Sequence, residues 1–379
     1  MAKGEIRVYH CRGRPLKSKF SFTASRMVIT PKPKVSVIIP NYNHARFLPQ
    51  RLDTVLGQTF QDFELILLDD CSTDGSRSIL SKYADETKVR IVFNAVNSGS
   101  PFKQWNKGVE LALGEYVWIA ESDDYADERL LEKLVARLDA EPAAALAYCR
   151  SWRVSLDDRP DGFVNSFESG EERYRWAADY CADGLAECRN YLALCNTIPN
   201  ASAVVFRRAV YHRVGGADET LGLCGDWKLW AAMALTGKVV YSAEPLNYYR
   251  FHDESMRTVS KRRGIDFAEK LRVRWWVLDQ ATRLESLTIN SQAKRGLANS
   301  FMCLAFESYP SSPDITRLAL QRVRELGGTD FIPRFGTWRG ELLKRTIGWK
   351  ATKRANILYH RYCRRALKTI GRWLKFVEP

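Results

Sequence analysis

The stretch YVWIAESDD, residues 116–124, decides the fold, because an apolar strand-like run ends directly in three carboxylates. Carboxylates this close together repel one another unless a cation lies among them. Hard divalent cations such as Mg²⁺ or Mn²⁺ take oxygen ligands, usually one or two carboxylates together with substrate phosphates. The stretch therefore predicts a metal–diphosphate site at the end of a strand. A solvated acidic turn that caps the helix after Asp127 is the alternative interpretation.

Outward from this stretch, apolar strand-like runs alternate with amphipathic helical stretches. Strands are expected at 35–39, 63–68, 89–93 and 116–120, and helices near 47–56, 75–83 and 101–113. Strands that alternate with helices of this length predict a Rossmann-like α/β fold with a mostly parallel sheet flanked by helices. After residue 124 the alternation loosens, with strands at 145–148, 203–206 and 239–241 and a helix at 226–235.

Polar residues follow each of the first strands. They are Asn41-Tyr42-Asn43, Asp69-Asp70, Asn94 and Glu121-Ser122-Asp123-Asp124. Ligands of parallel sheets bind at the carboxyl ends of the strands, so we expect these residues to line one site. No GxGxxG follows a strand and no GxxxxGK[ST] occurs, which disfavours a dinucleotide dehydrogenase and a P-loop ATPase.

Charge divides the 379 residues into three parts, with a net charge of +14 for the whole chain. The sequence predicts a basic N-terminal arm at 1–32, a catalytic domain at 33–260 and a basic α-helical domain at 261–379. No run of 18 apolar residues occurs, so no membrane-spanning helix is expected. Nine scattered cysteines without a CxxC pair favour a cytoplasmic location.

The last 50 residues are basic and amphipathic. Residues 330–379 hold 13 Lys/Arg and three acidic residues, and aliphatic and aromatic residues recur at near-helical spacing. This pattern is typical of a helix on an anionic surface, so we expect peripheral contact with the inner membrane face. A helix packed on its own domain is the alternative. No nucleic-acid-reading module is present, so no nucleic-acid partner is expected.

Six motifs, in order, resemble family 2 of the glycosyltransferases, whose members have the GT-A fold. They are VSVIIPNYN (35–43), LDDCSTDGS (68–76), NSG, NKG and GEY (97–116), ESDD (121–124), GDWKLW (225–230) and YRFH (249–252). The resemblance covers roughly residues 33–255. Three positions depart from the family pattern: Trp105 replaces a basic residue, Glu121 an Asp, and Gly225 a Glu.

The resemblance implies roles for individual residues. The donor nucleotide sugar would be contacted by Pro40, Tyr42, Asn43, Asp70, Asn97, Lys107, Glu121, Ser122 and Arg250. A Mg²⁺ or Mn²⁺ ion would be held by Asp123, Glu121 and His252, although His252 could contact the diphosphate instead. Tyr42 could instead be a packing aromatic, and Asp70 could instead cap a helix.

Asp226 is the proposed general base, because a sugar hydroxyl is a poor nucleophile until its proton is being removed. Trp227 and Trp230 flank it and could desolvate the carboxylate, which would raise its pKa. Asp226 could instead cap the helix that starts there.

Together these features predict an inverting, metal-dependent glycosyltransferase. It would move a sugar, from a UDP-sugar by preference, to a hydroxyl of a glycan or lipid-linked acceptor in surface polysaccharide biosynthesis. The alternative is a non-catalytic nucleotide-sugar or polysaccharide-binding protein with the same fold. A sugar-phosphate nucleotidyltransferase is disfavoured, because no glycine-rich basic loop follows the first strand.

Overall fold

The computed structural model describes residues 32–164, 175–198, 200–252, 265–285 and 312–326, and positions 298, 301, 302, 304, 305 and 308. The chain divides into two compact units, residues 1–32 and 33–379. The predicted basic arm, the proposed boundary near residue 260 and the amphipathic tail at 330–379 lie outside the described residues, so these three remain predictions.

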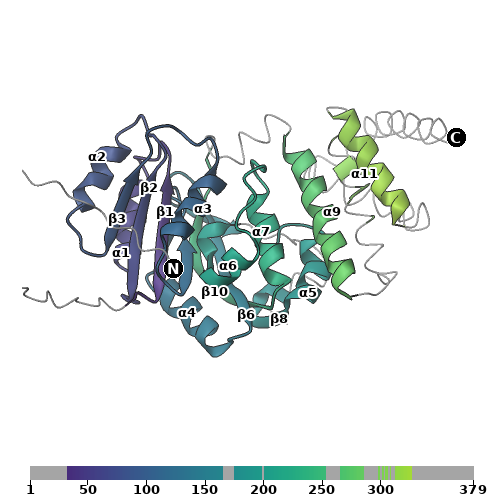
Figure 1. Ribbon diagram of the computed structural model, residues 1–379, viewed down its shortest axis with the longest axis horizontal. Coiled ribbons are helices and arrows are strands. Elements are labelled where there is room, and N and C mark those ends of the chain that lie inside the picture. Colours follow the sequence, from purple (N-terminus) through teal and green to yellow (C-terminus); the bar gives the residue numbers. More distant parts are fainter. Residues whose placement is uncertain are drawn as a thin grey trace, which may run out of the picture. The chain divides into compact units, whose positions relative to one another are not determined.

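Ten strands form one sheet at the centre of the second unit (Figure 1). They are β1 (Val35–Asn41), β2 (Phe63–Asp69), β3 (Val89–Phe93), β4 (Tyr116–Ile119), β5 (Tyr125–Ala126), β6 (Ala144–Val154), β7 (Pro160–Phe163), β8 (Tyr180–Asp183), β9 (Val204–Arg207) and β10 (Lys238–Arg250). The order along the sheet is β3-β2-β1-β4-β9-β6-β10-β5, with β7 on β6 and β8 on β10.

The first four strands are mutually parallel, as the alternation of strands and helices predicted. β9 then runs antiparallel to both β4 and β6, while β10 runs parallel to β6. The predicted mixed α/β fold with its mostly parallel sheet, consistent with GT-A, is confirmed. The predicted strands at 145–148 and 239–241 are the cores of longer strands, because β6 and β10 pair along nearly their full lengths.

Helices connect the strands and extend beyond them. They are α1 (Leu48–Leu56), α2 (Ser76–Leu80), α3 (Pro101–Leu111), α4 (Leu130–Ala140), α5 (Gly184–Glu187), α6 (Arg208–Arg213), α7 (Gly225–Ala234), α9 (Ile265–Glu285) and α11 (Pro313–Glu325), with the short turns η1 (Ser81–Tyr83), η3 (Cys188–Leu192) and η4 (Ala201–Ala203).

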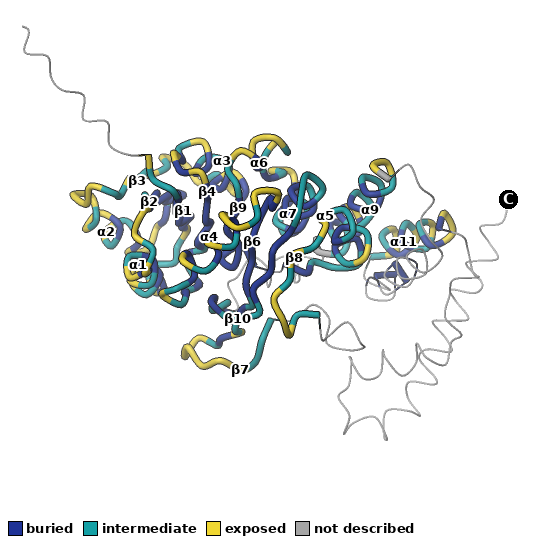
Figure 2. Tube along the Cα trace, turned by 90° about the horizontal axis from the view of Figure 1, so that it is seen from below, coloured by how far each residue is buried: buried dark blue, intermediate teal, exposed yellow. Residues whose placement is uncertain are grey.

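Two apolar layers cover the sheet, because residues of a buried strand point alternately to its two faces. Val37 and Ile39 of β1 pack with α1 and α4 on one face. Ile38 packs with α3 and α7 on the other. The central strands are accordingly buried along most of their lengths (Figure 2).

Helix α9 belongs to the same core as α7. Its Leu271, Val277 and Leu278 are buried in that cluster, and Ala319 and Val323 of α11 join them. Among the described helices, none is long and apolar enough to cross a membrane.

Candidate functional site

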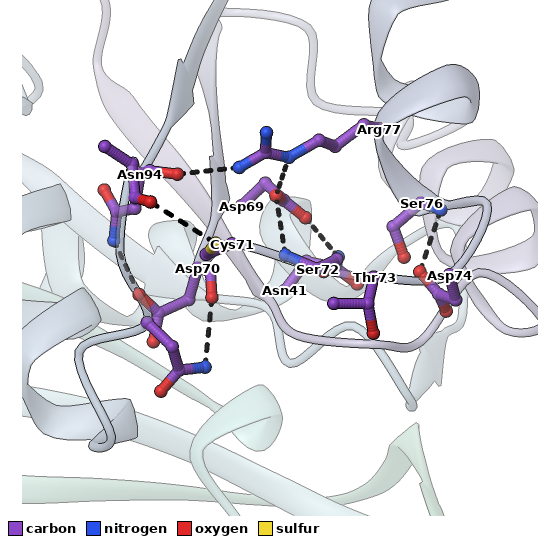
Figure 3. A network of polar contacts seen from close by, with 12 residues as sticks. Asn41, Asp69, Asp70, Cys71, Ser72, Thr73, Asp74, Ser76, Arg77 and Asn94 are labelled. Carbon is purple, nitrogen blue, oxygen red and sulfur yellow. Dashed lines mark hydrogen bonds and ion pairs between the residues drawn. The ribbon is translucent and has the colours of Figure 1, made fainter.

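The turn after β2 is held by Asp69 (Figure 3). Its carboxylate accepts hydrogen bonds from Asn41 Nδ2 at 3.0 Å, from the Ser72 backbone at 3.1 Å and from Arg77 Nε at 2.8 Å. Arg77 also donates to the Asn94 carbonyl at 2.7 Å. One buried carboxylate therefore ties together the carboxyl ends of β1, β2 and β3, the edge where ligands of parallel sheets bind.

Asp70, one of the predicted contacts of the donor nucleotide sugar, is buried with 4% exposure. Its oxygens accept from Asn94 Nδ2 at 2.6 Å, Gln104 Nε2 at 3.0 Å, and Ser98 Oγ at 2.7 Å. The Asn97 side chain in turn donates to the Asp70 carbonyl at 3.0 Å. The structure thus brings Asp70 and Asn97 together, but protein donors already occupy both oxygens of Asp70.

The loop after β1 presents an aromatic surface. Tyr42 is 46% exposed, whereas Pro40 is buried within β1 opposite Leu68. Asn43 adopts a left-handed conformation with φ of 57°, and its side chain accepts from the Thr73 backbone at 2.8 Å. Asparagine tolerates this conformation better than most residues, so it can fix the loop and leave the Tyr42 ring open to a ligand.

Three side chains converge at the end of β4. Asp123 Oδ2 lies 3.0 Å from His252 Nε2, and one ligand atom each of His44, Asp123 and His252 lie within 4.8 Å of one another. Burial opposes ionisation of Asp123, yet the hydrogen bond from His252 and the charge of His44 hold the pKa of this carboxyl below its usual value. The structure therefore assembles the predicted pair Asp123 and His252 and adds His44.

Glu121, a predicted metal and donor ligand, is directed elsewhere. Its Oε1 accepts from Trp105 Nε1 at 2.7 Å, and it is not part of the three-residue group. Burial, and then the charge of Asp123, raises the pKa of Glu121 to about 8. Trp105, where the family pattern has a basic residue, therefore contacts a carboxylate here. The metal-ligand role of Glu121 stays a prediction.

Asp124 is a buried structural carboxylate. It accepts from Asn200 Nδ2 at 3.0 Å, Ser202 Oγ at 2.7 Å and the Arg250 backbone at 2.9 Å. Burial, together with the charge of Asp123, raises its pKa to about 6. These bonds fasten the end of β10 to the end of β4, which places His252 beside Asp123.

Ser122 and Arg250, which are also predicted to contact the donor, lie near Asp124 and differ in their surroundings. Ser122 is buried, and its Oγ lies 2.8 Å from His44 Nδ1, which orients that ring. The Arg250 side chain is 2% exposed; it donates to Gln50 Oε1 at 2.6 Å and also bonds the Asp123 carbonyl and Asp158. A direct diphosphate contact would require Arg250 to give up such partners.

Lys107 Nζ lies 2.5 Å from Asn94 Oδ1, so this predicted donor contact joins the network around Asp70. The next residue of α3 packs directly on the sheet. A Cβ atom added to the neighbouring Gly108 would lie 2.5 Å from Ile38 of β1, which shows how closely α3 lies on the sheet.

Asp226 stands in the first turn of α7. Its Oδ1 accepts from the Trp227 backbone at 2.6 Å, and Asn196 Nδ2 lies 3.2 Å from Oδ2. Trp230, one turn later, stacks on Trp105 with ring centroids 6.1 Å apart. Because Trp105 donates to Glu121, a chain of contacts joins Trp230 of α7 to the acidic end of β4.

The loop before α7 is held from α9. Glu269 accepts from the backbone nitrogens of Gly222, Leu223 and Cys224 at 2.6, 2.7 and 2.9 Å. Gly225 follows, and a Cβ atom there would lie 2.5 Å from the Phe102 ring. Close packing against α3 is thus the physical reason for a glycine at this departure from the family pattern.

Sequence reasoning missed three residues of this region. His44 follows the Asn41–Asn43 loop, and a histidine directly after a predicted ligand loop was the available signal. Arg51 lies on the apolar face of α1, where a charged residue interrupts the pattern. Glu269 gave no signal, because its partners are backbone groups 45 to 47 residues away.

Comparison with known proteins finds similarity to glycosyltransferases. The sequence model described as glycosyl transferase family 2 matches residues 36–183. TuaG of Bacillus subtilis, a putative teichuronic acid biosynthesis glycosyltransferase, is 36% identical over 140 residues, which are 36% of this chain and 55% of that protein. Against three curated glycosyltransferases, the chain spans 65%, 55% and 19% of the length of the relative.

Two solved structures share the fold. The mannosyltransferase PcManGT from Pyrobaculum calidifontis, in complex with GDP-Man and Mn²⁺, matches 85% of this chain and 83% of its own with a TM-score of 0.53. TarS 1–349 from S. aureus, in complex with UDP-GlcNAc, matches 77% of this chain and 89% of its own with a TM-score of 0.50. Both are 18% identical to this chain, so they bear on its fold alone.

Proposed function

Because residues 36–183 of this chain match the model of glycosyl transferase family 2, we propose that the protein transfers a sugar from a nucleoside-diphosphate sugar to an acceptor hydroxyl, with inversion at the anomeric carbon. The observation that supports this most is the meeting of His44, Asp123 and His252 at the carboxyl end of β4. This edge of the sheet also carries the Asp69 and Asp70 networks, where a nucleotide would bind.

The three ligand atoms of His44, Asp123 and His252 fit a divalent cation. Asp123 supplies a carboxylate oxygen, and His44 and His252 supply imidazole nitrogens, within 4.8 Å of one another. Imidazole is a better ligand for transition metals than for Mg²⁺, so we favour Mn²⁺ of the two expected ions. The bound ion would neutralise charge that develops on the leaving diphosphate. Mn²⁺ in the PcManGT structure is consistent with this choice.

The nucleotide would lie across the ends of β1 to β3. The exposed Tyr42 ring offers a stacking surface for the base, and Asp70 is the proposed acceptor of a uracil N–H. Its hydrogen bonds to Ser98 and Gln104 preorganise the carboxylate, and the base N–H would replace one of these donors. We favour a UDP-sugar, as in the TarS complex, over a guanine nucleotide.

Asp226 would act as the base. Its Oδ2 is the oxygen to receive the acceptor proton, because Oδ1 already accepts from the Trp227 backbone at 2.6 Å. The Asn196 amide lies 3.2 Å from Oδ2 and would orient it. Glu269 fixes the preceding loop, so Asp226 is held in place before the acceptor binds.

The acceptor we propose is a glycan or lipid-linked glycan of surface polysaccharide biosynthesis. The name of the TuaG relative, which refers to teichuronic acid, is in keeping with this class. We further propose a cytoplasmic site of action with peripheral contact to the inner membrane face through the basic residues at 330–379.

A test separates catalysis from donor binding alone. Asp226→Asn should lower release of nucleoside diphosphate by at least about a hundredfold, because general-base catalysis contributes roughly 10²–10⁴. Donor affinity, measured by calorimetry with Mn²⁺ present, should stay within about twofold. Asp85→Asn, at an exposed loop position, is the matched control. Normal turnover by Asp226→Asn would remove the base assignment, and donor binding by the wild type without any release would favour the non-catalytic alternative.

A further inference from the structure

Arg51 of α1 is a fully buried arginine, with 0% exposure. It occupies the same apolar face of the helix as Leu48, Leu52 and Val55, all of which are wholly buried. A buried guanidinium is expensive unless opposite charge lies nearby.

The contacts of Arg51 point to the acidic end of β4. Its Nε donates to the Glu121 carbonyl at 2.8 Å, and its guanidinium carbon lies 5.6 Å from the Trp118 ring centroid. Its two terminal nitrogens have no hydrogen-bond partner within the described part of the chain. The carboxylates of Asp124, Asp123 and Glu121 are the negative charges that act on it, and burial still lowers its pKa to about 10.

Arg250 is the second cation beside this segment, and it is balanced differently. Its guanidinium forms an ion pair with Asp158, outside the acidic segment. Arg51 pairs with no carboxylate in the ranges that the structure describes. Of these two arginines, Arg51 is therefore the one whose charge is balanced by residues 121–124 as a group, whereas Arg250 also has a single carboxylate partner.

We propose that Arg51 is an internal counter-cation, which keeps the acidic end of β4 folded when no divalent ion is bound and moderates the affinity of that site for the ion. This inference rests on the metal site of the proposed function. It assigns Arg51 a positioning role, since no contact of Arg51 with donor or acceptor is implied.

Electrostatics gives the sign of the effect. We take an effective dielectric constant of about 20. The repulsion energy between a singly charged cation and a divalent ion then exceeds the free energy of a tenfold change in affinity at separations up to roughly 20 Å. Removing the charge of Arg51 should therefore tighten metal binding by at least about tenfold. Metal-free protein should lose stability, because the carboxylates of Asp124 and Asp123 are left without this counter-charge.

A purely structural arginine would behave otherwise. Replacing a desolvated cation by an apolar residue of similar length is often neutral or stabilising when the charge has no function. Loss of packing alone would lower the stability of the metal-free and metal-bound protein equally, and would weaken or preserve metal affinity.

The experiment measures Mn²⁺ binding by calorimetry and thermal unfolding with and without Mn²⁺, for Arg51→Met, Arg51→Lys and the wild type. Arg213→Met, at an exposed position on α6, is the control. We expect Arg51→Met to bind Mn²⁺ at least about tenfold more tightly, with a lower Tm in the absence of the ion and a larger rise on its addition. Arg51→Lys keeps the charge and should bind within about threefold of wild type.

Each outcome decides between the two proposals. If the wild type binds no Mn²⁺, the metal site itself is wrong and the inference falls with it. If the wild type binds but Arg51→Met binds no more tightly, the inference alone is overturned. Failure of Arg51→Met to fold even at saturating Mn²⁺ also overturns it, because the ion should replace the missing charge.

Discussion

Replacing Gly225 by alanine should destabilise the protein through a specific clash. The added Cβ atom would lie 2.5, 2.6 and 2.8 Å from three atoms of the Phe102 ring, closer than real Cβ contacts come. The ring cannot move freely, since it is 3% exposed and packs edge-on against Trp105 with centroids 5.1 Å apart. The strain must therefore pass to Trp105 or to the start of α7.

The size of the effect follows from two opposing terms. Overpacking in a well-packed core costs about 1–3 kcal/mol. Alanine is a better helix former than glycine by up to about 1 kcal/mol, but the first helical residue gains only part of this. We expect a net loss of about 1–2 kcal/mol in the free energy of unfolding, and a drop in Tm of roughly 2–6 °C.

Denaturant unfolding and a double-mutant cycle with Phe102→Leu test this expectation. The smaller side chain removes the atoms that clash, so the double variant should be more stable than the sum of the single effects by about 1 kcal/mol. Gly75→Ala is the control, because its methyl group would meet only Ala45 at 3.8 Å, and its effect should stay near about 0.5 kcal/mol. A Gly225→Ala variant as stable as wild type, with additive behaviour in the cycle, would refute the reasoning.

Two further predictions concern the metal site and the ion pair between the loop before α7 and Lys228 of α7. His44→Gln should weaken Mn²⁺ binding by at least about tenfold in calorimetry without lowering the Tm of the metal-free protein by more than a few degrees, and unchanged affinity would exclude His44 as a ligand. Burial opposes ionisation of Asp218, yet hydrogen bonds from Lys228 and Thr220 lower its pKa from 3.8 to about 2. Because this pKa is lowered, ionised Asp218 stabilises the fold above pH 3.8, and the contribution falls as the pH drops through 2. Asp218→Asn should therefore cost about 1 kcal/mol at neutral pH, after the full shift is discounted for solvent screening, and only a small part of that near pH 2. Equal destabilisation at both pH values in urea unfolding would contradict this.

The first half of the fold could be predicted because its signals are local. Buried parallel strands such as β1 and β2 appear as continuous aliphatic runs, and the structure has them where the sequence placed them, with ends shifted by one or two residues. The strands β5, β7 and β8 were not predicted, because they lack the apolar runs that marked β4 and β9, which are just as short as β7 and β8. The antiparallel course of β9 depends on its neighbours β4 and β6 rather than on its own residues.

For the candidate site, residue types next to strands were informative, whereas the partners of each side chain were not. The sequence pointed to Asp123 and His252, which lie 129 residues apart, and the structure brings them to 3.0 Å. The sequence alone did not indicate that the Glu121 carboxylate would accept a hydrogen bond from Trp105 or that Arg250 would be buried, because both depend on tertiary packing. The assignment of Asp226 as the base remains a proposal for kinetics to test.

The position of β9 has a bearing on how this chain could be divided. The stretch matched to the family ends at residue 183, yet β4 and β6, both inside it, are joined only through a strand at 204–207. A fragment cut at residue 183 would carry two sheet edges with unpaired backbone groups and would lack His252 and Asp226. Expression trials of a shortened protein should therefore keep the chain at least through β10. The stretch matched to the family is shorter than the smallest segment that contains all strands of the sheet.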